Sequence, residues 1–389
     1  MDLYMLDSLY RRTETVEEFE SLIWTERFSA KGDIELHIAS TLQNRTRFQE
    51  GVLLSQPDSY RVMRVETIED KTDEENRRML TIKGSSLEYI LEKRAALAAL
   101  SDLVTDPKWV LTGLPKDIAE QMFHDICVTG ILDAGDIITG IVEGSDLFPA
   151  DTIDAPSDSI EYSIDPQSLY TALKSLCDAY AMGFRIVKHP VTSVLYFDVY
   201  MGCDRTTAQT DLAAVVFSPD LDNLKDTTKL STDALYCNAA YVISQVGAEI
   251  VYPVDVDPSV EGFERRVLLV KADDIDDPDG PTASAQMIQR GREALSAARK
   301  YIALDGELAP TTSYVYGTDY NLGDLVELRD DDGATSYVQV TEQIFTSDTN
   351  GDRSFPTLAL NTFVTTGSWL SMGLTEWADM TTEEWADMP

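Results

Sequence analysis

The chain has 389 residues, 43% of them hydrophobic, and its 68 acidic against 31 basic residues give a formal net charge of −37. This length can bury a core in several domains, and the carboxylate excess excludes a protein that grips nucleic-acid phosphates. No segment is apolar enough for a membrane span, and the N-terminus lacks a signal-peptide layout, so we expect a protein made in the cytoplasm.

Residues 1–105 predict a β-rich domain with strands near 20–28, 33–40, 59–68 and 78–84. A helix is expected to follow from Ser85 or Ser86, with an apolar stripe through Ile90 and Leu97. The charged run 70–78 is interpreted as a hairpin tip. The apolar periodicity assigns these residues as core anchors: Leu22, Trp24, Phe28, Leu36, Leu87 and Leu91.

Residues 106–215 predict an inserted α+β domain. Its expected elements are a helix from Leu114, a strand at 159–164, a second helix from Pro166 to Met182 that Gly183 stops, and a hairpin around His189. The four cysteines have no metal-binding spacing, and we expect them to be reduced and structural: Cys127, Cys177, Cys203 and Cys237.

Residues 216–304 predict a second α+β region with a strand near 238–244, another after Arg266 and a long helix over 282–304. Its helical register directs one set of side chains to the core, namely Met287, Ile288, Arg292, Leu295 and Ala298, and another set to water, namely Gln289, Arg290, Glu293 and Lys300. Residues 305–360 predict further β-structure, with a hairpin turn at 347–354.

We assign no catalytic, cofactor-binding or metal-binding residue. The three histidines, His37, His124 and His189, stand in no recognisable catalytic context, and we interpret each as structural. The run 272–280 offers five aspartates as oxygen ligands, Asp273, Asp274, Asp276, Asp277 and Asp279. It departs from a calcium-binding loop because Pro278 interrupts the ligand pattern, so a solvated loop is the favoured interpretation.

The last segment, 361–389, carries a short internal repeat with a period of eight residues. Its members are Trp369, Met372, Trp377, Met380, Trp385 and Met388. An eight-residue period fits no helix face, so we expect an extended segment that docks these side chains on a neighbouring protein or folds back on the chain's own β-structure.

The first hundred positions contain a Trp-Thr-x-Arg-Phe strand, a Gly-x-x-Glu-Leu strand and a later Gly-x-x-Leu-x-x-Ile-Leu-x-x-Arg segment. These literal residues resemble the N-terminal signature of a siphophage minor tail protein family. The residues are Trp24, Arg27, Phe28, Gly32, Glu35, Leu36, Gly84, Leu87, Ile90, Leu91 and Arg94. Features near Asn238 and at Gly323-Asp324 resemble the same family.

The resemblance implies an α+β, multi-domain fold with two β-barrel-like hub domains and α+β domains between them. It implies a non-enzymatic tail-tip or baseplate hub in the virion, without a cofactor, that acts in host attachment and genome ejection. The implied partners are two further copies in a homotrimer, tail tube and distal tail proteins, receptor-binding proteins, and phage DNA only in transit. Alternatives are a tail-associated lysin and a glycan- or receptor-binding tail module.

The acidic charge has three possible explanations. It provides an ordinary solvated surface, it reflects a halophile proteome, or it lines a channel that must not retain passing DNA. With the resemblance, we expect much of the acidic excess to face the channel.

Overall fold

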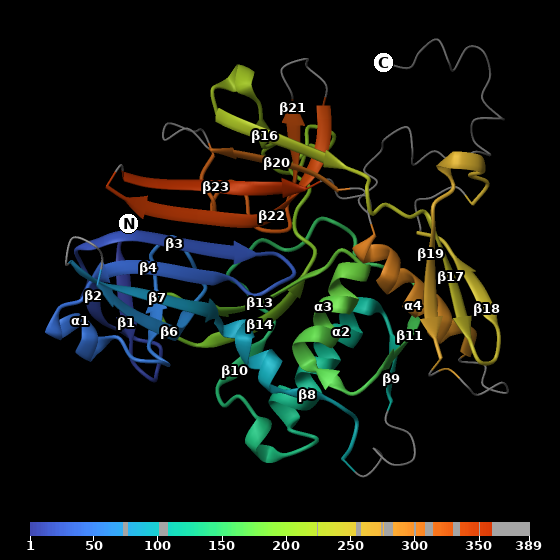
Figure 1. The fold of residues 1–389 in the computed structure, drawn as a ribbon, viewed down its shortest axis with the longest axis horizontal. Helices are drawn as coiled ribbons and strands as arrows, with labels where there is room; N and C mark the ends of the chain where they lie inside the picture. Colours follow the sequence, from blue (N-terminus) through green and yellow to red (C-terminus); the bar gives the residue numbers. More distant parts are fainter. Residues whose placement is uncertain are drawn as a thin grey trace.

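A computed structural model describes residues 1–72, 77–100, 108–223, 225–253, 258–273, 275, 283–298, 301–307, 314–329, 335–349 and 351–359. Its architecture is α+β and dominated by sheets (Figure 1). No described helix is long and apolar enough to cross a membrane.

The largest element is a sheet that, among the described residues, contains thirteen strands. Its order is β16-β20-β23-β22-β3-β4-β7-β6-β5-β1-β2, with β15 and β21 attached beside β22. The strands are β1 (Leu3–Leu6), β2 (Arg12–Val16), β3 (Phe19–Arg27), β4 (Asp33–Ala39), β5 (Leu53–Ser55), β6 (Met63–Thr72), β7 (Arg78–Ser86), β15 (Val216–Phe217), β16 (Lys225–Thr232), β20 (Tyr301–Glu307), β21 (Leu325–Arg329), β22 (Thr335–Asp348) and β23 (Gly351–Ala359).

Strand β3 is the seam between the two ends of the chain. It pairs with β4 on one side and with β22 on the other, where Trp24 lies opposite Phe345. Figure 1 shows the blue N-terminal strands and the red C-terminal strands side by side. The strand order has two free ends, so the described strands form no closed barrel, and the expected pair of barrel-like domains is not seen in this order.

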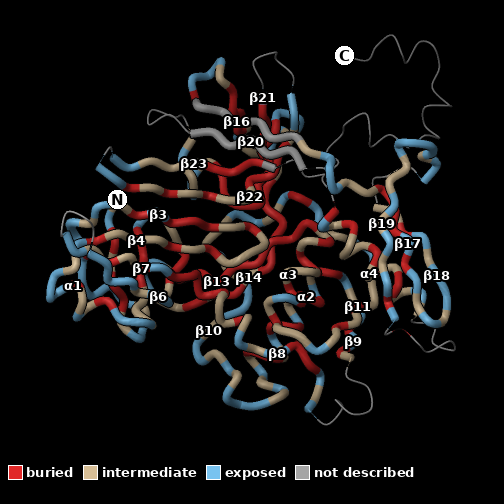
Figure 2. Tube along the Cα trace, in the orientation of Figure 1, coloured by how far each residue is buried: buried red, intermediate tan, exposed pale blue. Residues whose placement is uncertain are grey.

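Figure 2 shows buried positions along β3 and β4, in the core of the N-terminal half. Leu22, Trp24 and Leu36 are fully buried, and they pack in one cluster with Ile34 and Phe345. Phe28 follows β3 and packs in a separate cluster with Tyr200 and Tyr320. Period-2 alternation explains why one side of these strands is buried.

The middle of the chain packs helices α2 (Pro115–Phe123) and α3 (Leu169–Ala179) against the sheet β10-β14-β13. Stacked Phe123 and Phe197 rings join α2 to β14. A π-helical turn, His124–Thr129, extends α2. The strands here are β8 (Ala95–Ala96), β9 (Trp109–Gly113), β10 (Ile141–Glu143), β11 (Ile160–Ile164), β12 (Gln167–Ser168), β13 (Gly183–Lys188) and β14 (Leu195–Tyr200).

A smaller unit lies at the periphery, where helix α4 (Ala283–Ala297) covers one face of a three-stranded sheet (Figure 1). The sheet contains β17 (Ala239–Ser244), β18 (Ala248–Val251) and β19 (Val267–Ala272) in the order β18-β17-β19. Helix α4 also contacts α3 and β11, so it lies between this unit and the middle of the molecule.

The helix expected after Ser86 is a short 3₁₀ helix, Leu87–Lys93, with Ser86 at its N-cap. It ends at Arg94 because Ala95 and Ala96 pair with β12. Local periodicity could not reveal this pairing with a strand seventy residues later. Leu87 and Leu91 are nevertheless buried.

Two helix ends were wrong. Helix α3 ends at Ala179, and Ala181 supplies the left-handed backbone (φ 52°), while Gly183 begins β13. Helix α4 ends at Ala297, and Tyr301–Glu307 forms β20 because this segment pairs with β16 and β23. An expected boundary at 304/305 therefore falls inside a strand.

Two side chains of α4 that the sequence assigned to water face protein instead. Gln289 is buried and bonds both the backbone N–H and the carbonyl of Ser163. Glu293 accepts a hydrogen bond from Gln289, and burial raises the pKa of Glu293. Arg290 pairs with Asp165 of the same middle region, and Lys300 lies outside the described residues.

Four short elements near the N-terminus carry no clear sequence signal. They are β1, β2, β5 and helix α1 (Leu42–Arg47). Helix α1 has only six residues, and Thr41 caps its N-terminus through the backbone N–H of Asn44. Segments of three to six residues contain too few apolar positions for a period to emerge.

Candidate functional site

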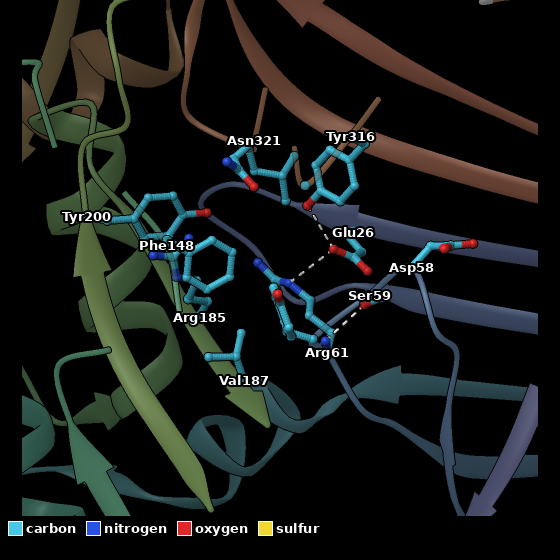
Figure 3. A pocket seen from close by; sticks show the side chains of 13 residues that line it. Glu26, Asp58, Ser59, Arg61, Phe148, Arg185, Val187, Tyr200, Tyr316 and Asn321 are labelled. Carbon is cyan, nitrogen blue, oxygen red and sulfur yellow. Dashed lines mark hydrogen bonds and ion pairs between the residues drawn. The ribbon is translucent and has the colours of Figure 1, made fainter. Parts of the chain in front are cut away.

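The described part of the chain buries a cluster of charged side chains where its three main regions meet, and Figure 3 shows Arg61 and Glu26 of this cluster. Arg61 precedes β6 and is 2% exposed, and Glu88 in the 3₁₀ helix is fully buried. Nη1 of Arg61 lies 2.5 Å from Oε1 of Glu88, and Nη2 donates to the carbonyl of Arg27 at 2.7 Å. The same Glu88 oxygen accepts from the backbone N–H of Ile186 at 2.8 Å, which ties β13 to the N-terminal strands.

The charge state of Arg61 follows from its partners. Burial alone would lower the pKa of Arg61, but the carboxylates of Glu88 and Glu26 raise it above its ordinary value. The Nε atom of Arg61 lies 3.9 Å from Oε2 of Glu26. A buried guanidinium with two carboxylates is stabilised only while its partners stay in place.

Glu26 connects the cluster to the C-terminal part of the chain. It accepts hydrogen bonds from the Trp24 indole N–H at 3.0 Å and from the Tyr316 hydroxyl at 3.0 Å. Figure 3 shows Glu26 between Tyr316 and Arg61. Three segments that are distant in the sequence therefore share one carboxylate.

Arg185 of β13 forms a second ion pair beside the cluster. Its guanidinium donates to Asp198 of β14, and it lies between two rings, 3.4 Å from the centroid of Phe148 and 3.8 Å from that of Tyr200. This cation–π sandwich fixes the side chain where β13 approaches the loop before β6. Burial raises the pKa of Tyr200 to about 12.

Phe28 joins the same three regions by apolar packing. A Cβ at Gly183 would lie 2.3 Å from the Phe28 ring, and one at Gly323, whose φ is +90°, would lie 2.6 Å from it. Both positions require glycine because the ring occupies the side-chain space. The resemblance to the tail family included Phe28 and Gly323. Because the Phe28 ring fills the side-chain space at position 323, the structure explains why these two residues occur together.

Asp324 follows Gly323, the glycine that contacts the Phe28 ring, and its side chain is buried. It is 2% exposed, and its carboxylate accepts from Arg205 Nε at 2.7 Å and from two backbone N–H groups, those of Cys203 at 2.8 Å and Asn321 at 2.9 Å. Burial raises the pKa of Asp324 against these hydrogen bonds.

A groove of about 520 Å³ opens beside the cluster, between the loop before β6 and the segment 314–318. Aromatic side chains line part of it, namely Tyr60, Tyr314, Tyr316, Tyr320 and Phe345. Beneath the groove, the Glu88 carboxylate pairs with Arg61, and the Glu26 carboxylate accepts hydrogen bonds from Trp24 and Tyr316, so the arrangement holds the regions together.

The predicted structural residues are distributed over the molecule. His37 contacts Glu35, His124 contacts Glu143, and His189 accepts from two backbone N–H groups of its own turn. Within the described ranges, no three His, Cys, Asp or Glu side chains gather as a metal site. Of the run 272–280, Asp274 and residues 276–280 lie outside those ranges, as do the docking residues Trp369, Met372, Trp377, Met380, Trp385 and Met388.

The charged cluster was missed by sequence analysis. Its one signal is a charged residue inside an apolar run, as in Tyr60-Arg61-Val62-Met63 and Ser86-Leu87-Glu88. Such a residue is costly to bury without a partner, so it marks a candidate for a buried ion pair.

The fold is shared with phage tail proteins. A tail protein from Neisseria meningitidis MC58 superposes with a TM-score of 0.55 at 12% identity, covering 93% of this chain and 96% of the other. The 43 kDa tail protein of prophage MuSo2 from Shewanella oneidensis superposes with a TM-score of 0.54 at 12% identity, and the match covers 92% of this chain and 98% of the other.

The family is more specific than the fold. The model of the Siphovirus ReqiPepy6 Gp37-like proteins matches residues 2–357, and the chain belongs to this family. The search of curated proteins found no match to this chain. The expected resemblance is confirmed, because the matching family is a siphovirus family and the fold is shared with solved tail proteins.

Proposed function

We propose that this protein is a structural hub of the siphophage tail tip, which assembles as a homotrimeric ring that closes the tail tube and connects it to distal tail-tip proteins. The observation that carries the proposal is the large sheet, which joins residues 1–105 to the C-terminal strands in a fold shared with tail proteins over nearly the whole chain. In this arrangement the large sheet faces the tube, while residues 106–215 and the unit of β17, β18, β19 and α4 form outer domains.

The buried junction supports a mechanical role. Arg61, Glu88 and Glu26 link the N-terminal strands, β13 and the segment around Tyr316, and Phe28 with its two glycines links the same parts again. A ring that transmits force from receptor to tube needs subunits that do not come apart. A buried ion pair whose partners sit on different segments opposes small displacements of these segments, because breaking the pair while the site stays dry leaves an unpaired charge in a low dielectric.

The acidic surface supports a channel that lets DNA pass. Exposed carboxylates follow the large sheet, among them Glu14, Glu17, Glu20, Glu66, Glu69 and Asp70. Carboxylates at a lumen repel phosphates, so the genome slides without binding. We propose that the large sheet, with the exposed carboxylates along it, lies toward the lumen and that the protein acts in host attachment and genome ejection.

The aromatic groove favours a second candidate, a glycan- or receptor-binding tail module. A site of about 520 Å³ with several tyrosines has the size and lining of a small-ligand site. The lysin alternative has no comparable support, because the family and the fold indicate no catalytic activity.

Copy number tests the hub. Quantitative mass spectrometry of purified virions should give three copies per tail, and mass photometry of the concentrated protein should detect a trimer, or a monomer that assembles only on the tail. Six copies or one copy per virion would contradict the ring. Retention on immobilised cell-wall glycan that is lost on Tyr314→Ala would favour the second candidate.

A further inference from the structure

The outer face of the β18-β17-β19 sheet is apolar and exposed. Helix α4 covers the inner face, where Ala240, Val242, Val251 and Ala272 are buried. The side chains that alternate with these point away from α4. At the start of β17, Ala239 is buried, and the others are exposed: Tyr241, Ile243, Ala248, Ile250, Val267, Leu269 and Lys271. Figure 2 shows exposed positions along these strands at the edge of the molecule.

The strand register brings these side chains together into one patch, which we name the outer face. Tyr241 lies opposite Ile250 on one side and Leu269 on the other, and Ile243 lies opposite Ala248 and Lys271. Ile250 and Leu269 are 53% and 59% exposed. The side chains on a sheet face in contact with water are normally polar. The apolar side chains on this exposed face therefore mark an interaction surface.

The charge of the outer face is opposite to that of the chain. None of its seven residues is acidic, although the protein has 68 acidic residues. Lys271 lies on the face, and Arg265 borders it with its guanidinium 6.0 Å from the Tyr241 ring centroid and 5.5 Å from that of Tyr252. The occupant that fits is therefore aromatic and acidic.

One segment of this chain has that chemistry. Residues 367–389 contain three tryptophans, three methionines, five carboxylates and no basic residue. Trp and Met side chains suit an apolar sheet face, and the carboxylates between them complement Lys271 and Arg265.

The segment also begins close enough to reach the outer face. Ala359, the last residue of β23, pairs with Ala303 of β20. Five residues before Ala303, the carbonyl of Ala298 accepts a hydrogen bond from the N–H of Cys237, just ahead of β17. Five extended residues span at most about 18 Å and thirty span about 100 Å, so residues 360–389 can cross the sheet.

We propose that the C-terminal segment of the protein folds back on its own outer face and covers Tyr241, Ile250 and Leu269 with Trp and Met side chains of the eight-residue repeats. The acceptor is thus the peripheral sheet, distinct from the large sheet of the hub. The segment occupies a surface that would otherwise bind another tail protein or aggregate. This inference does not depend on the proposed trimer.

Photo-cross-linking of the full chain tests the contact. With p-benzoylphenylalanine at Trp377 and a dilute sample, irradiation should join that position to peptides containing Tyr241–Ile250 or Val267–Lys271 of the same chain. Cross-links that fall in the aromatic groove, that join two copies of the chain, or that are absent would overturn the proposal.

Protease protection gives an independent readout. Glutamyl endopeptidase cleaves after Glu376, Glu383 and Glu384, and Leu269→Asp or Ile250→Asp should accelerate release of the C-terminal peptides at least about tenfold. The matched control is Leu42→Asp, at a residue that is 75% exposed on α1, far from the outer face in sequence. Equal release rates from the wild-type chain and both outer-face variants would overturn the proposal, and circular dichroism checks that each variant is folded.

Discussion

Two regions of the molecule distribute polar and apolar groups in opposite ways. At the junction around Arg61, charged side chains are buried and paired, whereas on the outer face of β18-β17-β19 apolar side chains are exposed. Both arrangements are costly in isolation, one by desolvation of charge and the other by hydration of apolar surface. The difference teaches that the junction is complete among the described residues, whereas the outer face is the surface that we propose the C-terminal segment of the same chain covers.

Replacing the aromatic core residue of the junction should give the largest loss. Trp24 is fully buried, and its indole N–H donates a hydrogen bond to Glu26. Trp24→Ala should therefore lower the free energy of unfolding by about 3–5 kcal/mol. Phe263→Ala, in the fully exposed position before β19, should change it by less than about 0.5 kcal/mol. Urea unfolding followed by tryptophan fluorescence measures the first change and circular dichroism the second; equal losses would end the contrast between the regions.

Removing the buried cation should cost about 3 kcal/mol. Arg61→Met leaves Glu88 buried without its partner, and the double variant Arg61→Met/Glu88→Gln should recover part of the loss. Arg11→Ala is the control, because the Arg11 side chain is 64% exposed in its ion pair with Asp7. A double variant as unstable as the single one would show that the charge pair is not the cause.

A carboxylate of α4 should report burial through pH. Because burial raises the pKa of Glu293, the folded state favours its protonated form; the resulting stability is present at low pH and is lost as pH rises through the folded pKa. Glu293→Gln should therefore raise Tm by a few degrees at pH 7 and leave it unchanged near pH 3.5. Calorimetry at the two pH values measures this, and a lower Tm at pH 7 would contradict it.

The smallest expected effect lies at the surface. A hydrogen bond from His124 to Glu143 raises the pKa of His124, so the pair stabilises the fold at low pH and loses this effect as pH rises through that pKa. His124→Gln should cost less than about 0.5 kcal/mol at pH 5 and nothing at pH 8, because both side chains are largely exposed. A larger loss at pH 8 than at pH 5 would refute this assignment.

The local patterns of the sequence predicted much of the secondary structure. The hairpin β3–β4, helices α2 and α3 and the hairpin β13–β14 follow from strong periodicity with apolar residues on one side. Helix α4 was harder because it packs on two sides. Its second buried side carries Gln289, which hydrogen-bonds to the backbone of Ser163 and to the Glu293 carboxylate. Polar side chains on this side leave no apolar period.

The candidate site depends on contacts that no local pattern contains. Arg61, Glu88 and Ile186 are brought together by folding, and Glu26 meets Tyr316 across most of the chain. Likewise the pairing of β3 with β22 makes one sheet from strands that the sequence assigned to separate domains. Periodicity reports which side of an element is buried, but it does not report its partner.

Cryo-electron microscopy of the intact tail tip tests the central claim most directly. The account predicts a threefold ring of this protein at the end of the tube, with the large sheet and its exposed carboxylates toward the lumen and the β17–β19 unit at the periphery. A ring of another symmetry, or a subunit that turns the peripheral unit toward the lumen, would contradict it.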